Sequence, residues 1–243
     1  VLFFVGTRCS YKLHWRYFGL KWHIFWASVC IGFSQFAFQM ASSVLNVILN
    51  HALLRYGGNV AISAIGIAIS VNTIILMPLI GLSQGAQPLI GYNHGARKYT
   101  TAIQTLKMAI RWGTVITTVG FVLIEIFARP VVTVFNSTDQ ELISMAAYAV
   151  RVLNLLLPLV AFQILTTSFF QAINKPLKAA FLSLSRQVLL VIPLVLILPL
   201  FLGLNGVFFS PPIADAISVV LAFVLLKRHF EKYRQNFFFS KKH

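Results

Sequence analysis

Uncharged apolar stretches run through almost the whole chain. Residues 22–54 and 56–96 contain no Asp, Glu, Lys or Arg, and each run is long enough to cross a hydrocarbon core of roughly 30 Å as a helix. Together with the later apolar runs they predict about six spans, at 24–54, 60–93, 108–128, 147–171, 179–201 and 205–226. A helix satisfies its own backbone polar groups in lipid. The pattern therefore predicts an all-α integral membrane protein whose transmembrane part occupies 24–229.

The composition excludes a water-soluble domain. Apolar residues make up 58% of the 243 positions and charged residues 10%, against about a quarter charged in soluble domains. The 20 Lys and Arg against 5 Asp and Glu give a net charge of +15. In a soluble protein this charge would suggest nucleic acid, but basic residues at the edges of apolar runs are typical of loops held at anionic lipid. Anionic membrane lipids are therefore expected partners, and nucleic acid is not.

The basic residues also predict an orientation. Arg55, Arg129 and Arg151 fall on one side of the predicted spans, and the other Lys and Arg residues fall on the opposite side. By the positive-inside rule both ends of this chain lie in the cytoplasm, including a basic tail at 230–243. We expect a multi-pass protein of a bacterial plasma membrane.

The sequence carries no common catalytic or metal-binding motif. Cys9 and Cys30 form no CxxC pair, and no two of the six histidines have metal-ligand spacing within a helix. The motifs GxSxG, HExxH and GxxxxGKS/T are absent, which argues against a hydrolase and an ATP-driven pump. We expect no enzymatic activity, metal or cofactor, so a driving force would come from an ion gradient or another subunit.

Two stripes of neutral polar residues interrupt the apolar pattern. Four or three residues separate successive members, so each stripe lies on one face of a helix. The first stripe is Gln35, Gln39, Ser42, Asn46 and Asn50, and the second, below a predicted kink at Pro158, is Gln163, Thr167, Gln171 and Asn174. They either line a water-filled cavity for polar or cationic solutes or form interhelical hydrogen bonds worth about 0.6 kcal/mol each. The presence of two stripes favours the cavity.

Asp215 lies near the centre of the last predicted span. An unpaired carboxylate there costs at least about 2.5 kcal/mol, so acids inside a membrane are candidates for function. Asp215 would bind and release a proton as its surroundings alternate between wet and dry. The alternatives are a fixed pair with Arg186 on the neighbouring span, or a cap on backbone freed by Pro211 and Pro212. Glu125, near the end of the third span, is expected to be a solvated interfacial charge.

Four ordered stretches resemble the multidrug and toxic compound extrusion (MATE) family. The signature-like stretch is GLSQGAQPLIGYNHGARKY, from Gly81 to Tyr99. The other stretches are IGFSQFAFQMASSVLNVILNHALLRYGG, LLLPLVAFQILTTSFFQAINKPLKAAFLSLSRQVLL and FLGLNGVFFSPPIADAIS. Together they cover nearly the whole chain.

The resemblance implies one lobe of a two-lobe transporter with alternating access, a plan shared by other secondary transporters. The chain resembles the second six-helix lobe, so 1–6 would end the preceding helix, 7–23 would be the basic cytoplasmic linker, and the missing partner would be the N-terminal lobe. The family implies proton- or sodium-coupled export of organic cations and other drugs. Sodium-linked members carry acids on the first and fourth helices of this lobe. Here the first has Gln39 and the fourth has none, so H⁺ is favoured over Na⁺.

The signature residues predict a shaped cytoplasmic gate. Glycines permit close helix approach and a break in regular winding, and Pro88 removes one backbone donor. The gate candidates are Gly81, Gln84, Gly85, Pro88, Gly91, Tyr92 and Gly95. We therefore expect the second span to bend before it reaches the cytoplasm.

Two other interpretations remain. Flippases of lipid-linked oligosaccharides share this architecture, but they would be expected to line the cavity with Arg and Lys, whereas the stripes are neutral. Six spans without the other lobe would alternatively make a non-functional fragment or an assembly factor.

Overall fold

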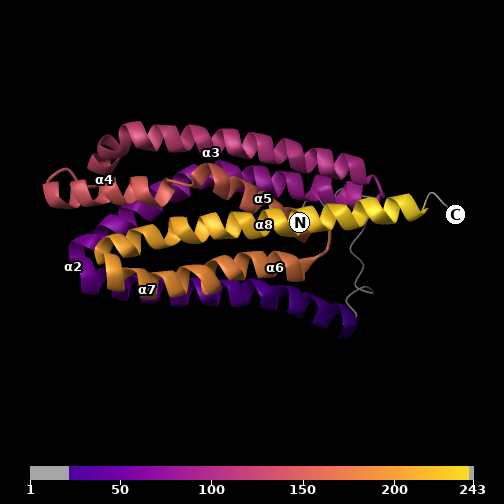
Figure 1. Ribbon diagram of the computed structural model, residues 1–243, viewed down its shortest axis with the longest axis horizontal. Helices are drawn as coiled ribbons and strands as arrows, with labels where there is room; N and C mark the ends of the chain where they lie inside the picture. The colour runs from indigo at the N-terminus through magenta and orange to yellow at the C-terminus, as the bar shows by residue number, and fades with distance from the viewer. Residues whose placement is uncertain (1–21, 241–243) are drawn as a thin grey trace, which may run out of the picture. The chain divides into compact units, whose positions relative to one another are not determined.

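The computed structural model describes residues 22–240, which form helices joined by short turns (Figure 1). The predicted segment 1–6 and most of the linker at 7–23 lie outside the described residues. The chain divides into two units, Val1–Ala37 and Phe38–His243. In the described part of the first unit, Trp22 stacks on Phe25 at the start of a helix, with ring centroids 5.4 Å apart.

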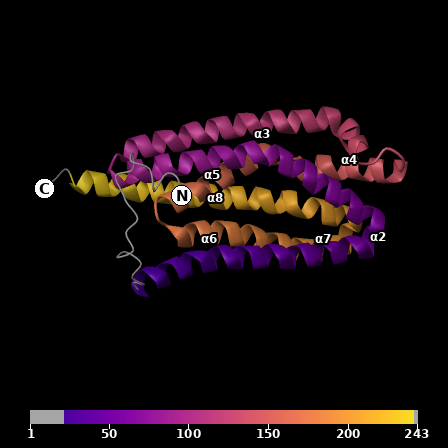
Figure 2. The same cartoon turned by 180° about the vertical axis from the view of Figure 1, so that it is seen from behind.

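The long helix α2, Trp22–Gly95, reverses direction at one glycine. Gly58 has φ 65° and ψ −161°, a region that a glycine enters far more readily than other residues. The stretch from Gln39 to Gly95 has 57 residues, about 85 Å of helix at 1.5 Å per residue, which is far more than one crossing requires. Within the second unit, the chain turns back near Gly58, and the two segments of α2 diverge from there with α6, α7 and α8 between them (Figure 2). They correspond to the predicted spans at 24–54 and 60–93.

Helices α3 and α4 are joined by a tight turn. Helix α3 spans Tyr99–Phe135 and α4 spans Gln140–Asn154. Asn136 Oδ1 accepts hydrogen bonds from the amides of Thr138 and Asp139. Asp139 Oδ1 then accepts from the amides of Glu141 and Leu142, which caps α4 at the end where a carboxylate is favourable.

The predicted span at 147–171 is a broken helix that starts earlier than expected. Helix α4 ends at Asn154, α5 spans Leu157–Ala172, and the two are bent by 50°. Pro158 lies in the first turn of α5, where its missing N–H costs no helical hydrogen bond. The kink expected at Pro158 is therefore a break at the residues just before it.

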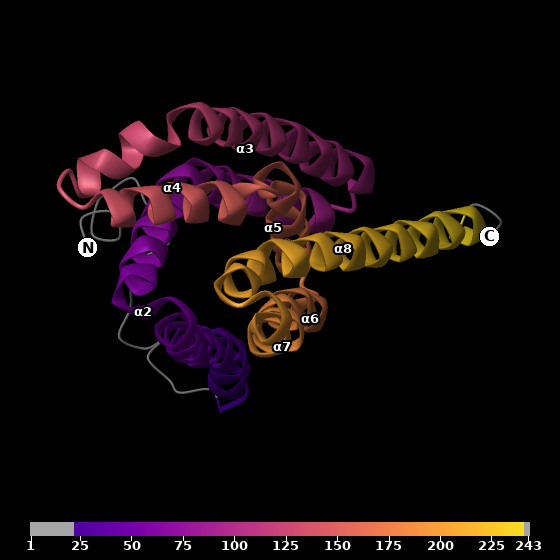
Figure 3. The same cartoon turned by 60° about the vertical axis from the view of Figure 1, so that its left-hand side comes forward.

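The last two spans are also longer than predicted. Helix α6, Pro176–Leu184, continues through a π-helix, η2, Ser185–Val191, into α7, Ile192–Leu202. After Gly203 the chain enters α8, Leu204–Ser240. In Figure 3, α8 lies between α5 on one side and α6 and α7 on the other, and it packs against all three.

The described residues form a multi-pass all-α membrane protein. Four helices are individually long and apolar enough to cross a membrane, and the bent pair α4 and α5 makes a fifth span. Because α2 is interrupted at Gly58 and is long enough for two crossings, the total is compatible with the six expected. Between 22% and 39% of each spanning window is buried, so most side chains in the spans face outward, as contact with lipid requires.

Two apolar clusters occupy opposite ends of the lobe. The first cluster joins the residues around the Gly58 reversal to α4, α7 and the start of α8. The second joins the end of α2 and the start of α3 to α5, α6 and the later part of α8. We call the end that carries the second cluster the basic end, because Arg97, Lys98, Lys175 and Lys227 lie there. The opposite end carries the Asn136–Asp139 turn.

Buried polar residues fill the interval between the clusters. On α8 the first cluster ends at Ala214 and the second begins at Ala222, and Asp215 and Ser218 lie between them. Other helices repeat the arrangement, and their buried polar residues in this interval are Asn154 on α4, Thr117 on α3 and Ser185 on η2. The lobe therefore has a polar layer at mid-depth.

Candidate functional site

An ion pair between η2 and α8 occupies the polar layer. Arg186 Nε lies 2.5 Å from Asp215 Oδ1 and donates a hydrogen bond to it. Asp215 is 5% exposed, whereas the side chain of Arg186 is 33% exposed. Asp215, the candidate proton-responsive acid, thus contacts Arg186, its candidate partner. A buried carboxylate paired with a single cation is sensitive to a change in charge, because losing either charge leaves the other poorly compensated.

The π-helical winding of η2 carries the cation of this pair. Ser185–Val191 bonds with the wider π pattern immediately before Pro193, which lies in the first turn of α7. Such segments are rare and occur often at functional sites. Gln187, one residue beyond Arg186, donates from Nε2 to Ser42 Oγ on α2 at 2.7 Å. The segment therefore contacts both α2 and α8 through polar side chains.

Three side-chain hydrogen bonds form a seam between α2 and the broken helix. Asn72 Nδ2 donates to Asn154 Oδ1 at 2.8 Å, and Gln87 Nε2 donates to Gln171 Oε1 at 3.0 Å. The third bond joins the hydroxyls of Ser83 and Ser168 at 2.5 Å. We call these six residues the α2–α5 seam. Only Gln171 was predicted as a site residue, and the signal for the three α2 members is that polar residues recur on one face of α2.

The first predicted stripe is largely exposed on this chain. Gln39, Asn46 and Asn50 are exposed, while Ser42 is half-buried and bonded to Gln187. The Gln35 side chain lies outside the described residues. We call Gln39, Asn46 and Asn50 the exposed stripe.

The second predicted stripe divides among different environments. Gln163 is 3% exposed, whereas Gln171 and Asn174 are exposed. Thr167 donates to the carbonyl of Gln163 in its own helix. Asn174 ends the helix with φ 56°, a conformation that asparagine adopts more readily than most residues. The spacing of the second stripe is helical, but its members do not form one continuous exposed surface in the structure.

Buried polar atoms extend the polar layer along α5 and α8. Gln163 Oε1, Thr166 Oγ1 and Ser218 Oγ are fully buried and lack a hydrogen-bond partner among the described residues. Gln163 and Thr166 are three residues apart on α5, so they share a face. Buried oxygens of this kind are commonly satisfied by internal water. The sequence analysis did not identify Thr166 or Ser218.

The signature glycines are mostly uncrowded within this chain, and their role in a gate stays a prediction. A Cβ added at Gly81, Gly85 or Gly95 would meet nothing within 4 Å, and α2 keeps helical winding through Pro88. Close approach occurs only at Gly91, where a Cβ would lie 3.3 Å from the carbonyl oxygen of Ala172. Neither helix crowding nor a bend in the described helix supports the expectation for the other glycines. Gln84 and Tyr92 are exposed.

The basic end holds a cluster of aromatic and basic residues that the sequence analysis missed. His229 is 3% exposed and its Nδ1 lies 3.4 Å from Lys175 Nζ. Its ring meets Phe169 and Phe170 edge-on, with centroids 6.0 and 5.4 Å away. His94 of α2 lines the same small pocket as His229. The cluster joins the ends of α2, α5 and α8.

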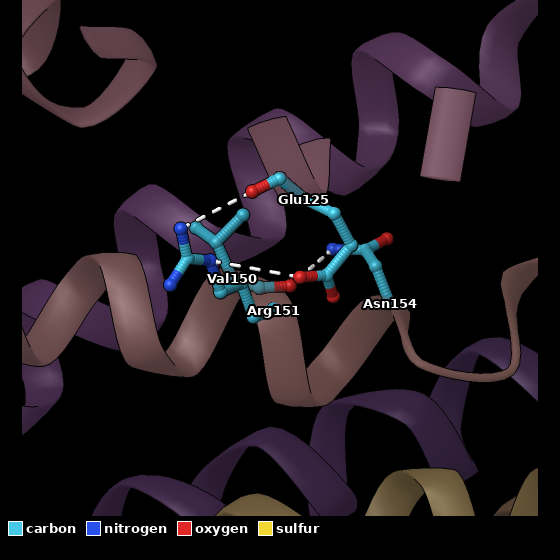
Figure 4. Close-up of polar contacts among 4 residues, drawn as sticks. All are labelled: Glu125, Val150, Arg151 and Asn154. Carbon is cyan, nitrogen blue, oxygen red and sulfur yellow. Dashed lines mark hydrogen bonds and ion pairs between the residues drawn. The ribbon is translucent and has the colours of Figure 1, made fainter. Parts of the chain in front are cut away.

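Glu125 belongs to a second ion pair near the opposite end. Figure 4 shows Arg151 of α4 directed at Glu125 of α3, with Nε 3.7 Å from Oε2 and Nη2 3.1 Å from the Glu125 carbonyl oxygen. Both side chains are more than a third exposed, so Glu125 is a partly solvated charge that also has a partner. The same view shows Asn154 donating to the carbonyl of Val150.

Comparison with known proteins identifies the family. The profile of the MatE family matches residues 31–197. A multidrug export protein, MepA, from Staphylococcus haemolyticus is 29% identical over 196 residues, which cover 81% of this chain and 42% of that protein. A protein named FAD transporter from Shewanella oneidensis is 24% identical over 177 residues, which cover 73% of this chain and 39% of that one. The chain thus spans less than half the length of these curated relatives.

Solved structures agree with the fold. The MATE multidrug transporter DinF-BH, solved with R6G, superposes with a TM-score of 0.81 at 32% identity and covers 93% of this chain and 51% of that chain. An outward-facing MATE family transporter of the MOP superfamily gives a TM-score of 0.86 at 20% identity, over 96% of this chain and 52% of that one. Since the family profile covers more than half of the sequence and the folds agree, this multi-pass membrane protein belongs to the MATE family.

Proposed function

We propose that this chain is part of a secondary multidrug efflux transporter that exports cationic or amphipathic compounds in exchange for protons. The observation that carries the proposal is the buried Arg186–Asp215 ion pair inside a polar layer. A buried acid in a membrane needs a partner or a proton. Proton coupling requires Asp215 to exchange between an ionised, Arg186-paired state and a protonated state. The two states give the lobe different net charges.

The protein's own residues would carry the coupling as follows. With Asp215 ionised, Arg186 holds η2 against α8. When Asp215 binds a proton, the attraction falls, and Arg186, which is already a third exposed, turns toward water. Buried oxygens on α5 and α8 would hold the water through which the proton arrives. The change in η2 would be transmitted to α2 through the Gln187–Ser42 hydrogen bond.

The exposed stripe would supply part of the substrate surface. Gln39, Asn46 and Asn50 are neutral hydrogen-bonding groups on the first crossing of α2, and such groups accept many amphipathic solutes. A second lobe facing them would complete a cavity, with alternating access between the two lobes. The neutral stripe favours drug export over flipping of pyrophosphate-linked lipids, which calls for basic residues. The basic end would face the cytoplasm of a bacterial plasma membrane.

Asp215→Asn tests the coupling. We expect it to abolish the pH-driven uptake of a cationic dye into everted membrane vesicles while dye binding to the purified protein persists. Glu125→Gln is the matched control, because it neutralises the acid of the other ion pair, and it should retain export. Unchanged pH-driven export by Asp215→Asn would show that Asp215 does not couple.

A double variant separates coupling from structure. Asp215→Asn alone removes the counter-charge of the partly buried Arg186, which destabilises the lobe. Arg186→Gln combined with Asp215→Asn removes both charges and should recover thermal stability. If that double variant also recovers pH-driven export, the pair is structural only.

A further inference from the structure

A hollow lies where α5 and α8 pack together near the basic end. It encloses about 430 Å³ and is lined by Phe162 of α5 and by five residues of α8. The α8 residues are Phe223, Leu226, Lys227, Phe230 and Glu231. They recur at three- and four-residue steps, so they form one face over about two helical turns. We call this feature the α5–α8 hollow.

The part of the hollow nearer the middle of α8, before Lys227, is apolar and aromatic. Phe162 and Phe223 face each other with ring centroids 6.4 Å apart, and Leu226 lies one turn further along α8. Phe230 closes the other end, with its ring 5.9 Å from that of Phe169. Rings and aliphatic carbon of this kind favour a hydrocarbon chain over a polar solute.

The rim carries two charges in a fixed order. Lys227 and Glu231 are exposed and four residues apart, so they are neighbours on the surface of α8. Among the described side chains, the ion pairs are Arg151–Glu125 and Arg186–Asp215. Lys227 and Glu231 are therefore not paired with each other. Lys227 is adjacent to the apolar part, and Glu231 is one turn further toward the end of the span.

The position along α8 matches the edge of a membrane. The uncharged apolar run of α8 ends at Leu226, charged residues recur from Lys227 onward, and the helix continues to Ser240. The hollow thus extends from the headgroup level inward toward the hydrocarbon. A ligand lying in it would have its polar part against Lys227 and Glu231 and its apolar part against the Phe residues.

We propose that the α5–α8 hollow binds an aminophospholipid whose acyl chain lies on Phe162 and Phe223. In phosphatidylethanolamine the phosphate is nearer the acyl chains and the primary ammonium lies beyond it. This order reproduces that of Lys227 and Glu231, so the cation meets phosphate and the carboxylate meets ammonium. The ammonium can donate hydrogen bonds to Glu231, which strengthens the contact.

The same two charges discriminate against other phospholipids. The trimethylated amine of phosphatidylcholine has no N–H to donate to Glu231. Phosphatidylglycerol carries a net negative charge and no amine, so its phosphate would meet Lys227 while Glu231 repels it. The rim therefore favours a zwitterionic lipid with a primary amine over either alternative.

Lipid retention on the purified full-length protein tests this site without any transport measurement. Protein is delipidated in detergent, incubated with equal amounts of dioleoyl phosphatidylethanolamine, phosphatidylcholine and phosphatidylglycerol, washed, and analysed by native mass spectrometry. We expect phosphatidylethanolamine to be retained about fivefold more than each of the others, a ratio that corresponds to one surface charge contact. Glu231→Gln should remove the preference over phosphatidylcholine. Lys227→Gln should lower retention of both zwitterionic lipids by about fivefold.

Arg228→Gln is the matched control. Arg228 is exposed on the same turn of α8 but does not line the hollow, so its removal should leave the lipid pattern unchanged. Equal retention of the three lipids by the unaltered protein would overturn the proposal. Preferential retention of phosphatidylglycerol would replace the aminophospholipid with an anionic lipid, and an equal effect of Arg228→Gln would mean a diffuse attraction rather than a site. Because Lys227, Arg228 and Glu231 are all exposed, the variants should fold.

Discussion

The exposed stripe and the α2–α5 seam are made of the same kinds of side chain but differ in whether those side chains bond to a neighbouring helix. Gln39, Asn46 and Asn50 project from the first crossing of α2 and are exposed. The seam on the second crossing uses Asn, Ser and Gln for hydrogen bonds of 2.5 to 3.0 Å to α4 and α5. The two crossings belong to one helix, interrupted at Gly58. Neutral polar residues in a span thus either form hydrogen bonds between helices or remain exposed as a surface that can contact a substrate.

The difference has an energetic meaning. In the seam each group has a protein partner, so removing one member leaves the other unsatisfied. In the exposed stripe, loss of an amide leaves no buried group without a partner. The seam should therefore be sensitive in stability, and the stripe should be sensitive in transport.

The largest effect is expected at the buried end of the seam. Asn154 is fully buried, accepts from Asn72 and donates to the carbonyl of Val150. Asn154→Leu should lower the free energy of unfolding by about 2 kcal/mol, because the partly buried amide of Asn72 loses its acceptor and the Asn154–Val150 side-chain bond is lost. Titration with SDS in mixed micelles measures this change. An unchanged unfolding midpoint would mean that the Asn72–Asn154 contact contributes nothing.

The middle of the seam should give a smaller effect. Ser83 is 6% exposed, and its hydroxyl contacts that of Ser168. Ser83→Ala should cost about 1 kcal/mol, and a double-mutant cycle with Ser168→Ala should give a coupling energy of about 0.6 kcal/mol, the average for such bonds in membranes. Strictly additive single effects would contradict a direct hydrogen bond. Ser63→Ala, at an exposed position of the same helix, serves as the control.

The smallest change in stability is expected in the exposed stripe. Asn46→Ala and Asn50→Ala should each alter the free energy of unfolding by less than about 0.5 kcal/mol, as is usual for exposed sites. Dye export should nevertheless fall, since the substrate loses a hydrogen-bonding group. A stability loss as large as that of Asn154→Leu would show that the stripe is covered by a structural partner instead.

The spans were predictable because lipid imposes a strong constraint on composition. A run without charges and of membrane length has one stable state, the helix, and this gave all six crossings. Pro158 also indicated the break before α5, whereas the division between the first two crossings was inferred from the uncharged runs and not from Gly58. Helix ends were less predictable, because a helix continues past the membrane wherever its backbone allows, as α8 does to Ser240.

The partners of the polar residues were only partly predictable. Periodicity places residues on a face of one helix, but it carries no information on the rotation and depth of the neighbouring helix. Gln171 was therefore assigned to a cavity although it bonds to Gln87, and Asn72 was not identified at all. The Arg186–Asp215 pair was one of the alternatives considered for Asp215, because opposite charges inside neighbouring spans favour contact. The α5–α8 hollow depends on how two helices pack, which no single run of residues reveals.

The π-helical turns of Ser185–Val191 also affect how this span can change in length during evolution. A π-turn closes its hydrogen bond over one more residue than an α-turn, so it accommodates an additional residue without rotating the helices on either side. Loss of one residue here would return the segment to ordinary winding while α6 and α7 keep their neighbours. Relatives of different length should therefore show their insertions and deletions in this span at these turns.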